Sequence, residues 1–486
     1  MSTTLDTSTN TASPIGCDKC LRRSSIASDV FQKTSSLESP LGFQVASSSP
    51  SPRWNSQCLC LFTRLPDKYL VEGIFPYLDI ASLVSSSQTC SRWRALTEEA
   101  SLYKNLHVDS LKTEAEAKAF KIISRRRLGD LIETLKVRVG GEINKEASRL
   151  SASTFSARLS RLSALSFIGA KSKTNAADVT SFVTAHPTLR RLILDGVTTL
   201  RDENVREMLG GLEGGGGLRQ LSVNQCRGLT NDFLTCLSNS ESANTLEILS
   251  FEGCVFSSSS LTSFLLSGGK NLKRLYARGL RGADDALCNV LSKCCPHLEE
   301  LDLSNENPFG TISDTSITDK GLNILASTLG SKLRSLRIQG HVQITDAGLA
   351  DALFKLPCLE VLDTRGCRLV SDLSASALAA SHDRKGLREV RFFGSSMSDA
   401  GLASLSPVLC RNSSSLEIVD LFGCKNFTFS AVKIFIEALS FSRNNQVSRA
   451  ATQHTTVCLG GIRCLQISSV KEDLLSISSN LKILFV

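Results

Sequence analysis

Aromatic side chains are scarce in this sequence of 486 residues, which contains 2 Trp, 4 Tyr and 22 Phe. No run of about 18 apolar residues occurs in it, which excludes an ordinary membrane-spanning helix. The first residues lack both a basic and an apolar segment, so we expect no secretory signal peptide. The net charge of +8 is small for this length and predicts no direct nucleic-acid partner unless the charge is concentrated in one patch.

Cysteine, in contrast, is abundant, with 17 residues. An odd number in a chain this long argues against a secreted domain held together by disulfides. The cysteines are therefore either metal ligands or reduced thiols that pack as small apolar residues. Reduced cysteines without an export signal favour the cytoplasm and/or the nucleus.

A repeat organises most of the chain. Leu218, Leu221, Val223 and Cys226 form the pattern LxxLxLxxC. The pattern returns at Leu246–Cys254, Leu359–Cys367 and Leu416–Cys424, with degenerate copies at Leu162, Leu189, Leu272, Leu298, Leu333 and Leu387 and weaker ones at Ile132, Ile462 and Leu481. Most starts lie about 26–29 residues apart, within the range of leucine-rich repeats. Each copy predicts a short strand with one buried face, followed by a loop and an amphipathic helix.

The helix starts share a second pattern. Thr318-Asp319, Thr345-Asp346 and Ser398-Asp399 are each followed by one variable residue, a glycine and a leucine. Hydroxyl and carboxylate side chains at these places are expected to cap the first amide groups of the helix.

Over roughly residues 130–486 the chain resembles the cysteine-containing subclass of leucine-rich repeats. The resemblance implies an α/β solenoid, shaped as a horseshoe, with parallel strands on the concave side and helices on the convex side. It also implies that Cys226, Cys254, Cys367 and Cys424 turn inward and pack, so they are not zinc ligands. Other copies carry Val197, Leu280, His341 or Ser395 at the same place, a mixture typical of an apolar socket.

Two insertions interrupt the repeat, near residues 305–315 and 440–461. Insertions in solenoids form loops on one face and often contribute to binding. For the second insertion a disordered bulge is an equal alternative.

Residues 61–106 resemble the F-box, a small all-α module. The matching positions include Leu65-Pro66-Asp67, Leu70, Ile74-Phe75, Leu78, Leu83, Cys90 and Trp93-Arg94. The alternative is that these apolar residues form a helical core without that role. The resemblance implies that the module docks on the Skp-type linker protein of a cullin–RING ubiquitin ligase. The residues then expected at this contact are Leu65, Pro66, Leu70, Ile74, Phe75, Leu78, Leu83 and Trp93.

The predicted organisation therefore has four parts. A Ser- and Thr-rich tail at 1–57 is too poor in apolar residues to fold and is expected to be disordered. The F-box follows at 61–106, a helical linker at 107–130 and the solenoid at 131–486.

Signatures of catalysis are missing from the sequence. The glycine clusters at 214–217 and 267–270 lack phosphate-loop spacing, and the 6 His form no HExxH motif. Cys17, Cys20, Cys58 and Cys60 could form a zinc site, but their spacing makes this the weaker interpretation. We expect no catalytic residue, metal or cofactor.

The strand pattern places two columns of side chains on the concave face. Because adjacent strands lie about 4.8 Å apart, these residues are neighbours in space. Arginine and aromatic side chains suit interface anchoring and the binding of acidic or phosphate groups. The resulting candidates for client binding are Tyr276, Arg278, Arg337, Arg365, Arg391, Phe393 and Phe422. The alternative is that Asp302, Asp363 and Asp420 neutralise these arginines.

These features predict a non-catalytic, substrate-recognition subunit of an SCF-type E3 ubiquitin ligase. The F-box would bind the Skp-type linker and the cullin–RING core, and the concave face would hold an unknown client protein. Two alternatives remain: a repeat scaffold outside ubiquitin transfer, and a co-receptor that binds its client together with a small molecule.

Overall fold

The computed structural model describes residues 65–108, 119, 122–123, 128–139, 159–169, 176–305, 316–380, 386–446, 454–477 and 480–485. The tail predicted at 1–57, most of the predicted linker and residues 306–315 of the first insertion lie outside these ranges.

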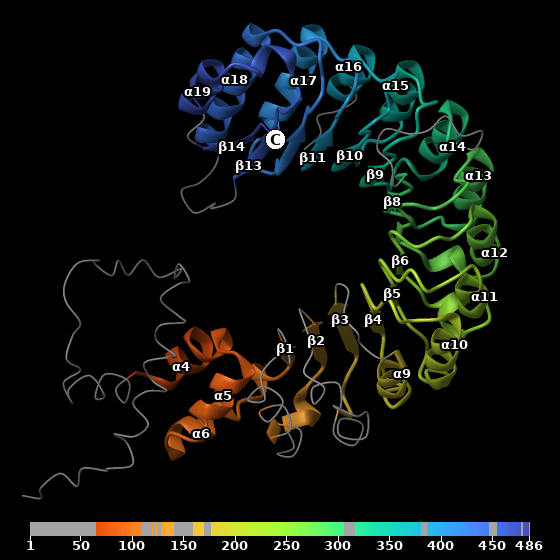
Figure 1. Ribbon diagram of the computed structural model, residues 1–486, viewed down its shortest axis with the longest axis vertical. Coiled ribbons are helices and arrows are strands. Elements are labelled where there is room, and N and C mark those ends of the chain that lie inside the picture. The colour runs from red at the N-terminus through yellow and green to blue at the C-terminus, as the bar shows by residue number, and fades with distance from the viewer. Residues whose placement is uncertain are drawn as a thin grey trace, which may run out of the picture.

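The described residues form one parallel sheet of 14 strands, in which each strand pairs with its neighbours in the sequence. The strands are β1 (Asn105–Val108), β2 (Thr134–Val139), β3 (Ala164–Gly169), β4 (Arg191–Ile193), β5 (Gln220–Ser222), β6 (Ile248–Ser250), β7 (Arg274–Tyr276), β8 (Glu300–Asp302), β9 (Ser335–Arg337), β10 (Val361–Asp363), β11 (Glu389–Arg391), β12 (Ile418–Asp420), β13 (Thr455–Cys458) and β14 (Leu481–Leu484). The sheet curves into an arc and forms its inner wall (Figure 1). The predicted leucine-rich-repeat solenoid is confirmed.

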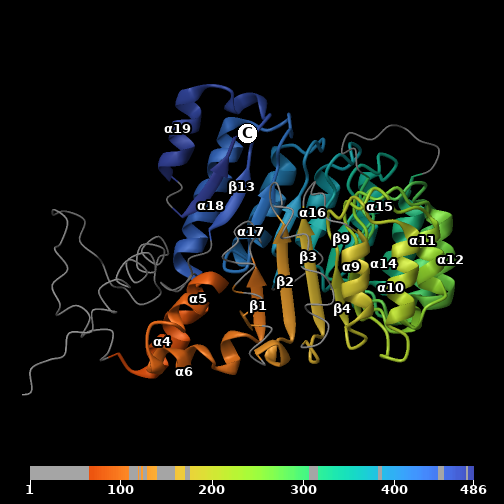
Figure 2. The ribbon, with the colours of Figure 1, turned by 60° about the horizontal axis from the view of Figure 1, so that its bottom comes forward.

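Helices cover the outer rim of this arc, as Figures 1 and 2 show from two directions. They are α9 (Ala176–Thr184), α10 (Asp202–Gly211), α11 (Asp232–Ser238), α12 (Ser258–Gly268), α13 (Asp285–Cys294), α14 (Asp319–Leu329), α15 (Asp346–Phe354), α16 (Asp372–Ala380), α17 (Asp399–Arg411), α18 (Phe429–Gln446) and α19 (Ser468–Ile477). Between sheet and helices, the repeat leucines stack in register; Leu221 of β5, for example, pairs with Leu192 of β4 and Leu249 of β6. No single repeat could bury these side chains alone, so stacking is obligatory.

The ninth residue of the repeat points into the core. The thiols of Cys226, Cys254, Cys367 and Cys424 donate to the carbonyl oxygens of Leu194, Val223, Ile338 and Phe392, at 3.1, 3.2, 3.3 and 3.3 Å. In each case the acceptor belongs to the preceding repeat. Burial raises the pKa of Cys226 to about 12 and that of Cys424 to about 11, so these groups stay protonated at neutral pH. Each one packs and serves as a weak donor.

His341 occupies the same socket in its repeat. Its Nε2 lies 2.9 Å from the carbonyl oxygen of Leu303, and its Nδ1 accepts from the amide of Ile317 at 3.2 Å. Burial lowers the pKa of His341, and the hydrogen bond to Leu303 opposes this only in part. The ring therefore replaces the thiol donor as a neutral imidazole.

Carboxylates link the helix starts of successive repeats. Asp319 is the first residue of α14, yet its side chain accepts from the amide and hydroxyl of Thr345 in the next repeat, at 2.8 and 2.6 Å. Asp285, Asp372 and Asp399 bind Thr318, Ser398 and Thr428 in the same way. Asp346 binds both Ser371 and Ser374. We call this set, Asp285, Asp319, Asp346, Asp372 and Asp399, the carboxylate ladder. The predicted hydroxyl caps are also present, for Thr318, Thr345 and Ser398 each cap their own helix.

The glycine of the motif makes room for the ladder. A Cβ atom built on Gly348 would lie 2.0 Å from the carboxyl carbon of Asp319, and one on Gly321 or Gly401 would lie 2.3 Å from Asp285 or Asp372. The glycine is thus required by a side chain from the preceding repeat.

Two boundaries and one predicted repeat start differ from the prediction. The sheet begins at Asn105, inside the segments assigned to the F-box and the helical linker. The second insertion is shorter than 440–461, because α18 continues to Gln446 and β13 starts at Thr455. The register of β13 with β12 pairs Val457 with Val419, so Ile462 corresponds to Cys424 and fills the socket; it does not start a repeat.

We expect Gly348→Ala to lower the free energy of unfolding by about 2–4 kcal/mol, because the new methyl group displaces Asp319 from Thr345. Gly210→Ala is the matched control. That glycine also lies in a convex helix, nothing lies within 4 Å of its Cβ position, and alanine there should stabilise by about 0.5–1 kcal/mol. Urea denaturation followed by circular dichroism measures both; equal effects would contradict the ladder's steric role.

We also expect the stability of the protein to fall as the pH drops below 6.5, the ordinary pKa of histidine, in part because of His341. Its pKa is lower in the folded state, so below that pH the unfolded chain binds a proton that the folded chain excludes. The His341→Cys variant, which restores the residue of the other sockets, should lose up to about 1.4 kcal/mol per pH unit of this slope. Identical slopes for the two proteins between about pH 7.5 and 5.5 would show that His341 does not contribute.

Candidate functional site

Short helices before β1 form the module that carries the first set of predicted contacts. They are α4 (Asp67–Gly73), η1 (Phe75–Tyr77), α5 (Ile80–Ser86), α6 (Ser91–Thr97) and η2 (Ala100–Leu102). Pro66 stands immediately before α4, and the Asp79 carboxylate caps α5 by accepting from the amide of Ser82 at 2.7 Å. Arg92 on α6 holds the start of the module, because it donates to Asp67 at 2.6 and 2.9 Å.

Part of the predicted docking set forms the core of this module. Leu70, Phe75 and Leu83 are buried, and the Phe75 ring meets Trp93 edge to face at 5.6 Å between centroids. These three side chains belong to the core of the module, and the linker contact expected of them stays a prediction. Pro66 is exposed, and Leu65, Ile74, Leu78 and Trp93 are half-buried.

Two exposed tyrosines were missed by the sequence reasoning. Tyr69 on α4 and Tyr77 in η1 are each 58% exposed. In the sequence they lie on either side of the half-buried Ile74. We call Pro66, Tyr69, Ile74 and Tyr77 the tyrosine surface. One signal was present in the sequence: only 4 tyrosines occur in the chain, and two of them fall within this short segment.

The module and the solenoid share their core. Tyr103 is buried and donates through its hydroxyl to the carbonyl oxygen of Thr97 at 2.6 Å. Leu106 of β1 pairs with Leu135 of β2, which places Tyr103 at the position that Ile132 occupies in the next repeat. The same residue therefore closes the helical module and opens the first repeat.

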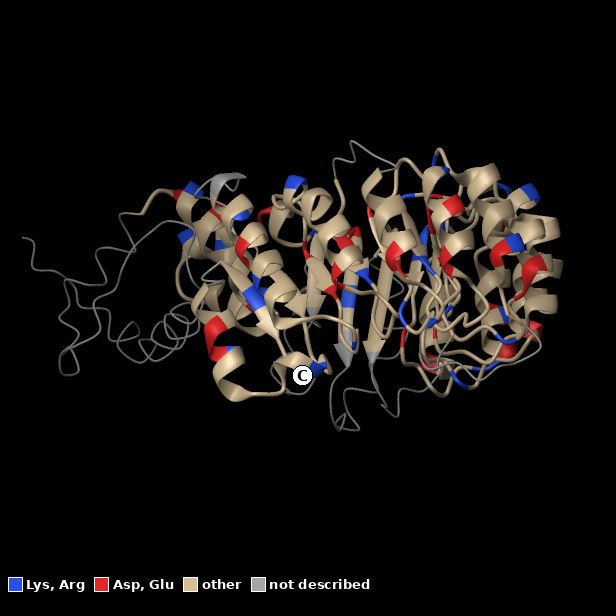
Figure 3. Ribbon diagram, turned by 90° about the horizontal axis from the view of Figure 1, so that it is seen from above, with Lys and Arg blue, Asp and Glu red and all other residues tan. Residues whose placement is uncertain are grey.

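On the concave face, the predicted arginines already have acidic partners. Arg337 and Arg391 share the carboxylate of Glu389, at 3.3 and 3.0 Å. Arg365 binds Asp363 with its Nη2 at 2.6 Å and its Nε at 2.9 Å. Lys and Arg are interspersed with Asp and Glu along the solenoid (Figure 3).

The structure thus brings Arg337, Arg365 and Arg391 together, each bound to a carboxylate, with one carboxylate shared between Arg337 and Arg391. Asp363 contributes as the alternative predicted, whereas Glu389 was missed. It sits at the first position of β11, a third concave column that the two predicted columns leave out. Burial raises the pKa of Asp302 and of Asp420, so the acids without such close pairing are weaker than usual.

Tyr276 and Arg278 lie further along the face. The Tyr276 hydroxyl donates to Glu300, and burial together with this bond raises its pKa. Arg278 makes one long contact, at 3.4 Å, with the side-chain oxygen of Gln339. Both residues are therefore held by neighbours on the concave face.

The two predicted phenylalanines form a stack. The rings of Phe393 and Phe422 are 4.8 Å apart between centroids and inclined by 12°. The register of β12 with β13 places Gly460 next in this column, so no side chain continues the stack. Gly461 beyond it has a φ of 68°, and a Cβ there would lie 3.3 Å from the Phe422 ring. The stack is a half-buried aromatic platform bordered by glycine backbone.

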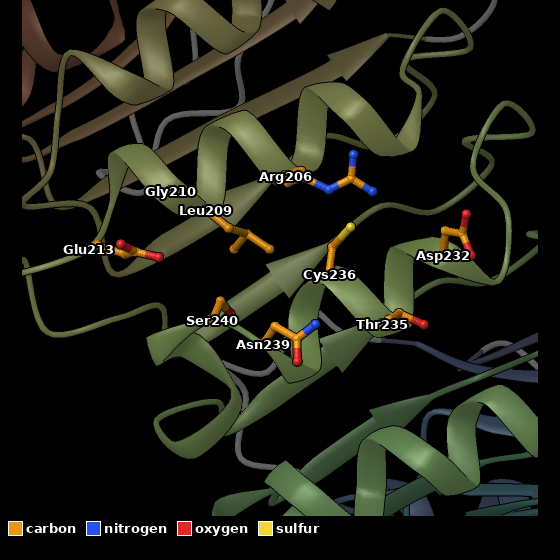
Figure 4. A pocket seen from close by; sticks show the side chains of 9 residues that line it. All are labelled: Arg206, Leu209, Gly210, Glu213, Asp232, Thr235, Cys236, Asn239 and Ser240. Atoms are coloured by element: carbon orange, nitrogen blue, oxygen red, sulfur yellow. The ribbon is translucent and has the colours of Figure 1, made fainter.

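A hollow of 410 Å³ lies on the convex side between α10 and α11 (Figure 4). Arg206, Asp232 and Glu213 line it together with Cys236 and polar residues. It has no histidine beside the cysteine, so this lining does not pair a nucleophile with a base.

Two negative findings apply to the described ranges alone. No cluster of three His, Cys, Asp or Glu side chains there is arranged for a metal ion, and no helix there is long and apolar enough to span a bilayer. Cys17, Cys20, Cys58 and Cys60, the alternative zinc ligands, lie outside those ranges.

Comparison with known proteins assigns the helical module. Residues 62–109 match the family model of the F-box-like domain. This part of the chain is an F-box-like domain. No curated protein matches the sequence. One solved structure that matches is a crystal structure of the Rad7 and Elc1 complex in yeast, at 18% identity and a TM-score of 0.49 over 89% of this chain and 93% of that chain.

Proposed function

We propose that this protein is a non-catalytic substrate-recognition subunit of an SCF-type cullin–RING E3 ubiquitin ligase. The tyrosine surface of the F-box-like domain docks a Skp-type linker, and the concave face of the solenoid binds a client protein for ubiquitination. The observation that carries the proposal is the F-box-like domain at residues 62–109, joined to a repeat solenoid through a shared core. We place the complex in the cytoplasm and/or nucleus, and the repeats in the cysteine-containing subclass.

The mechanism requires no catalytic group in this chain. A client held on the solenoid is kept close to the ubiquitin-loaded enzyme that the ligase core binds. The transfer then becomes effectively intramolecular, and proximity supplies its rate.

The aromatic platform of Phe393 and Phe422 is the part of the concave face that best fits a client. It is half-buried, its two rings are stacked, and it lies beside the arginines that Glu389 binds. Aromatic side chains in such positions commonly dominate binding energy at interfaces. The arginines orient the client through polar contacts at the rim of the platform, where their charge is partly balanced by Glu389 and Asp363.

Affinity purification of the full chain, with the proteasome blocked, tests the ligase role. We expect a Skp-type linker and a cullin among the co-purifying proteins. Their absence would favour a scaffold outside ubiquitin transfer, and client binding that depends on an added small molecule would favour the co-receptor alternative.

The double variant Tyr69→Ala/Tyr77→Ala should weaken binding to a purified Skp-type linker by about 10-fold or more, because both rings are exposed contact residues. Calorimetric titration measures the affinity. The matched control is Leu266→Ala/Phe354→Ala, which removes exposed apolar side chains from α12 and α15. Equal binding by the two variants would place the docking surface elsewhere.

The double variant Phe393→Ala/Phe422→Ala should reduce client recovery by about 10-fold or more while linker binding stays unchanged. Quantitative mass spectrometry of proteins retained by wild type and variant measures this. A thermal unfolding curve verifies the fold, because both rings are half-buried. An unchanged client list would remove the platform from the binding surface.

A further inference from the structure

One edge of the sheet carries a column of charged residues that the concave face does not include. They occupy the second position of each repeat, just before the strands. Backbone bonds place them side by side: the amide of Arg219 donates to the carbonyl of Arg190 at 2.7 Å, and that of Glu247 to Arg219 at 2.8 Å. Lys273 follows Glu247 in the same way, also at 2.8 Å.

Most cations of this column are neutralised by their neighbours. Arg334 pairs with Glu360 at 2.5 Å and Arg388 with Glu417 at 2.9 Å. Lys273 binds Glu247 at 2.7 Å, and this bond holds the pKa of Glu247 below its usual value. Glu247 is therefore an anion that Lys273 already binds.

The column is different at β4 and β5. Arg191, the first residue of β4, adjoins this column from the third concave column, to which Glu389 also belongs. In the described part of the chain, no acidic side chain pairs with Arg190 or with the exposed Arg191, and Arg190 makes only long contacts of 3.3 and 3.4 Å with two carbonyl oxygens. Arg219 reaches Glu247 at 3.8 Å, a carboxylate that Lys273 already holds more closely. Four cations therefore meet a single carboxylate at this edge.

Two adjoining hollows open on these residues. One, of 430 Å³, is lined by Arg190, Arg219 and Lys273, by Glu247, and by polar side chains that include Asn244 and Thr245. The other, of 390 Å³, is lined by Arg190, Arg191 and Arg219, again with Glu247, and by Ser163, Gln220 and Ile248. Among the described residues, Glu247 is the one acidic residue that lines either hollow, and Lys273 already holds it. Gly216 permits the first hollow, because a Cβ there would lie 3.1 Å from the Arg190 guanidinium.

We infer that this edge, which we call the arginine edge (Arg190, Arg191, Arg219 and Lys273), binds an acidic segment of a peptide. Guanidinium groups on strands about 4.8 Å apart are spaced to hold one anionic group between them, and arginine binds carboxylates and phosphates through paired hydrogen bonds. The two anions share this chemistry. That the peptide belongs to a client rests on the proposed function, whereas the binding itself does not.

Fluorescence anisotropy with the purified full chain tests the inference. The probes are short labelled peptides of degenerate sequence with a central Glu-Glu pair, a central phosphoserine or a central serine. The wild type should bind one or both acidic probes and leave the serine probe unbound. Binding should weaken as salt is raised above about 0.1 M, as expected for contacts between exposed charges.

The decisive variant is Arg190→Gln/Arg219→Gln, which should weaken acidic-probe binding by about 30-fold, because two charge-assisted contacts are lost. The matched control, Arg334→Gln/Arg388→Gln, makes the same change of charge on the same edge where the arginines are already paired, and should stay within about 2-fold. Because Arg190 touches backbone, the exposed pair Arg191→Gln/Arg219→Gln is a second test that does not disturb the fold.

The outcomes are distinct. Binding of only the phosphoserine probe assigns the edge to phosphate, and binding of only the Glu-Glu probe assigns it to carboxylate. No binding of either acidic probe by the wild type, or equal losses in the decisive and control variants, overturns the inference. Because no linker protein is present, failure here leaves the F-box proposal to be decided by its own purification experiment.

Discussion

Each repeat of the solenoid is completed by groups that its neighbour supplies, and the rest of the structure depends on this exchange. A carboxylate of one repeat satisfies the amide and hydroxyl at the next helix start, as Asp319 does for Thr345. A thiol or imidazole reaches back to the preceding carbonyl, as Cys367 and His341 do. In both kinds of bond the later repeat donates and the earlier repeat accepts, so an interior repeat is fully bonded only when both of its neighbours are folded. This local demand explains why a short pattern of leucines can specify a long arc.

The sequence predicts the repeating parts well because leucine spacing reports directly on which face is buried. It could not reveal the carboxylate ladder, since Asp319 stands where an ordinary helix cap would stand and its partner lies one repeat away. Contacts between repeats, which the sequence does not show, also explain why Ile462 was wrongly predicted to start a repeat. Its spacing to neighbouring leucines imitates a repeat start, and only the register with β12 assigns it to the socket. Tyr103 likewise looks like the end of a helical module, although it also opens the first repeat.

The candidate binding residues could be predicted only in part, for two physical reasons. An apolar stripe such as Leu70, Ile74 and Leu78 predicts a buried face, but it does not say whether the chain itself or a partner buries it. The fold buries Leu70 and leaves Tyr69 and Tyr77 exposed. On the concave face, the arginines were found because charge is conspicuous in a strand pattern. The partner that sequence reasoning missed is Glu389. It binds both Arg337 and Arg391, and this depends on side-chain positions that only the folded sheet defines.

Tyr103 has a geometric consequence for the whole molecule. Because it belongs to the F-box-like domain and to the first repeat at once, no independent joint separates the two at this point. The orientation of the aromatic platform relative to the tyrosine surface is then set by the number of repeats between β1 and β11 and by the rotation and rise that each repeat adds. Gain or loss of one repeat would rotate the platform relative to the tyrosine surface by the rotation that one repeat contributes. The number of repeats thus sets the orientation of the bound client relative to the docked linker, independently of the chemistry of any contact residue.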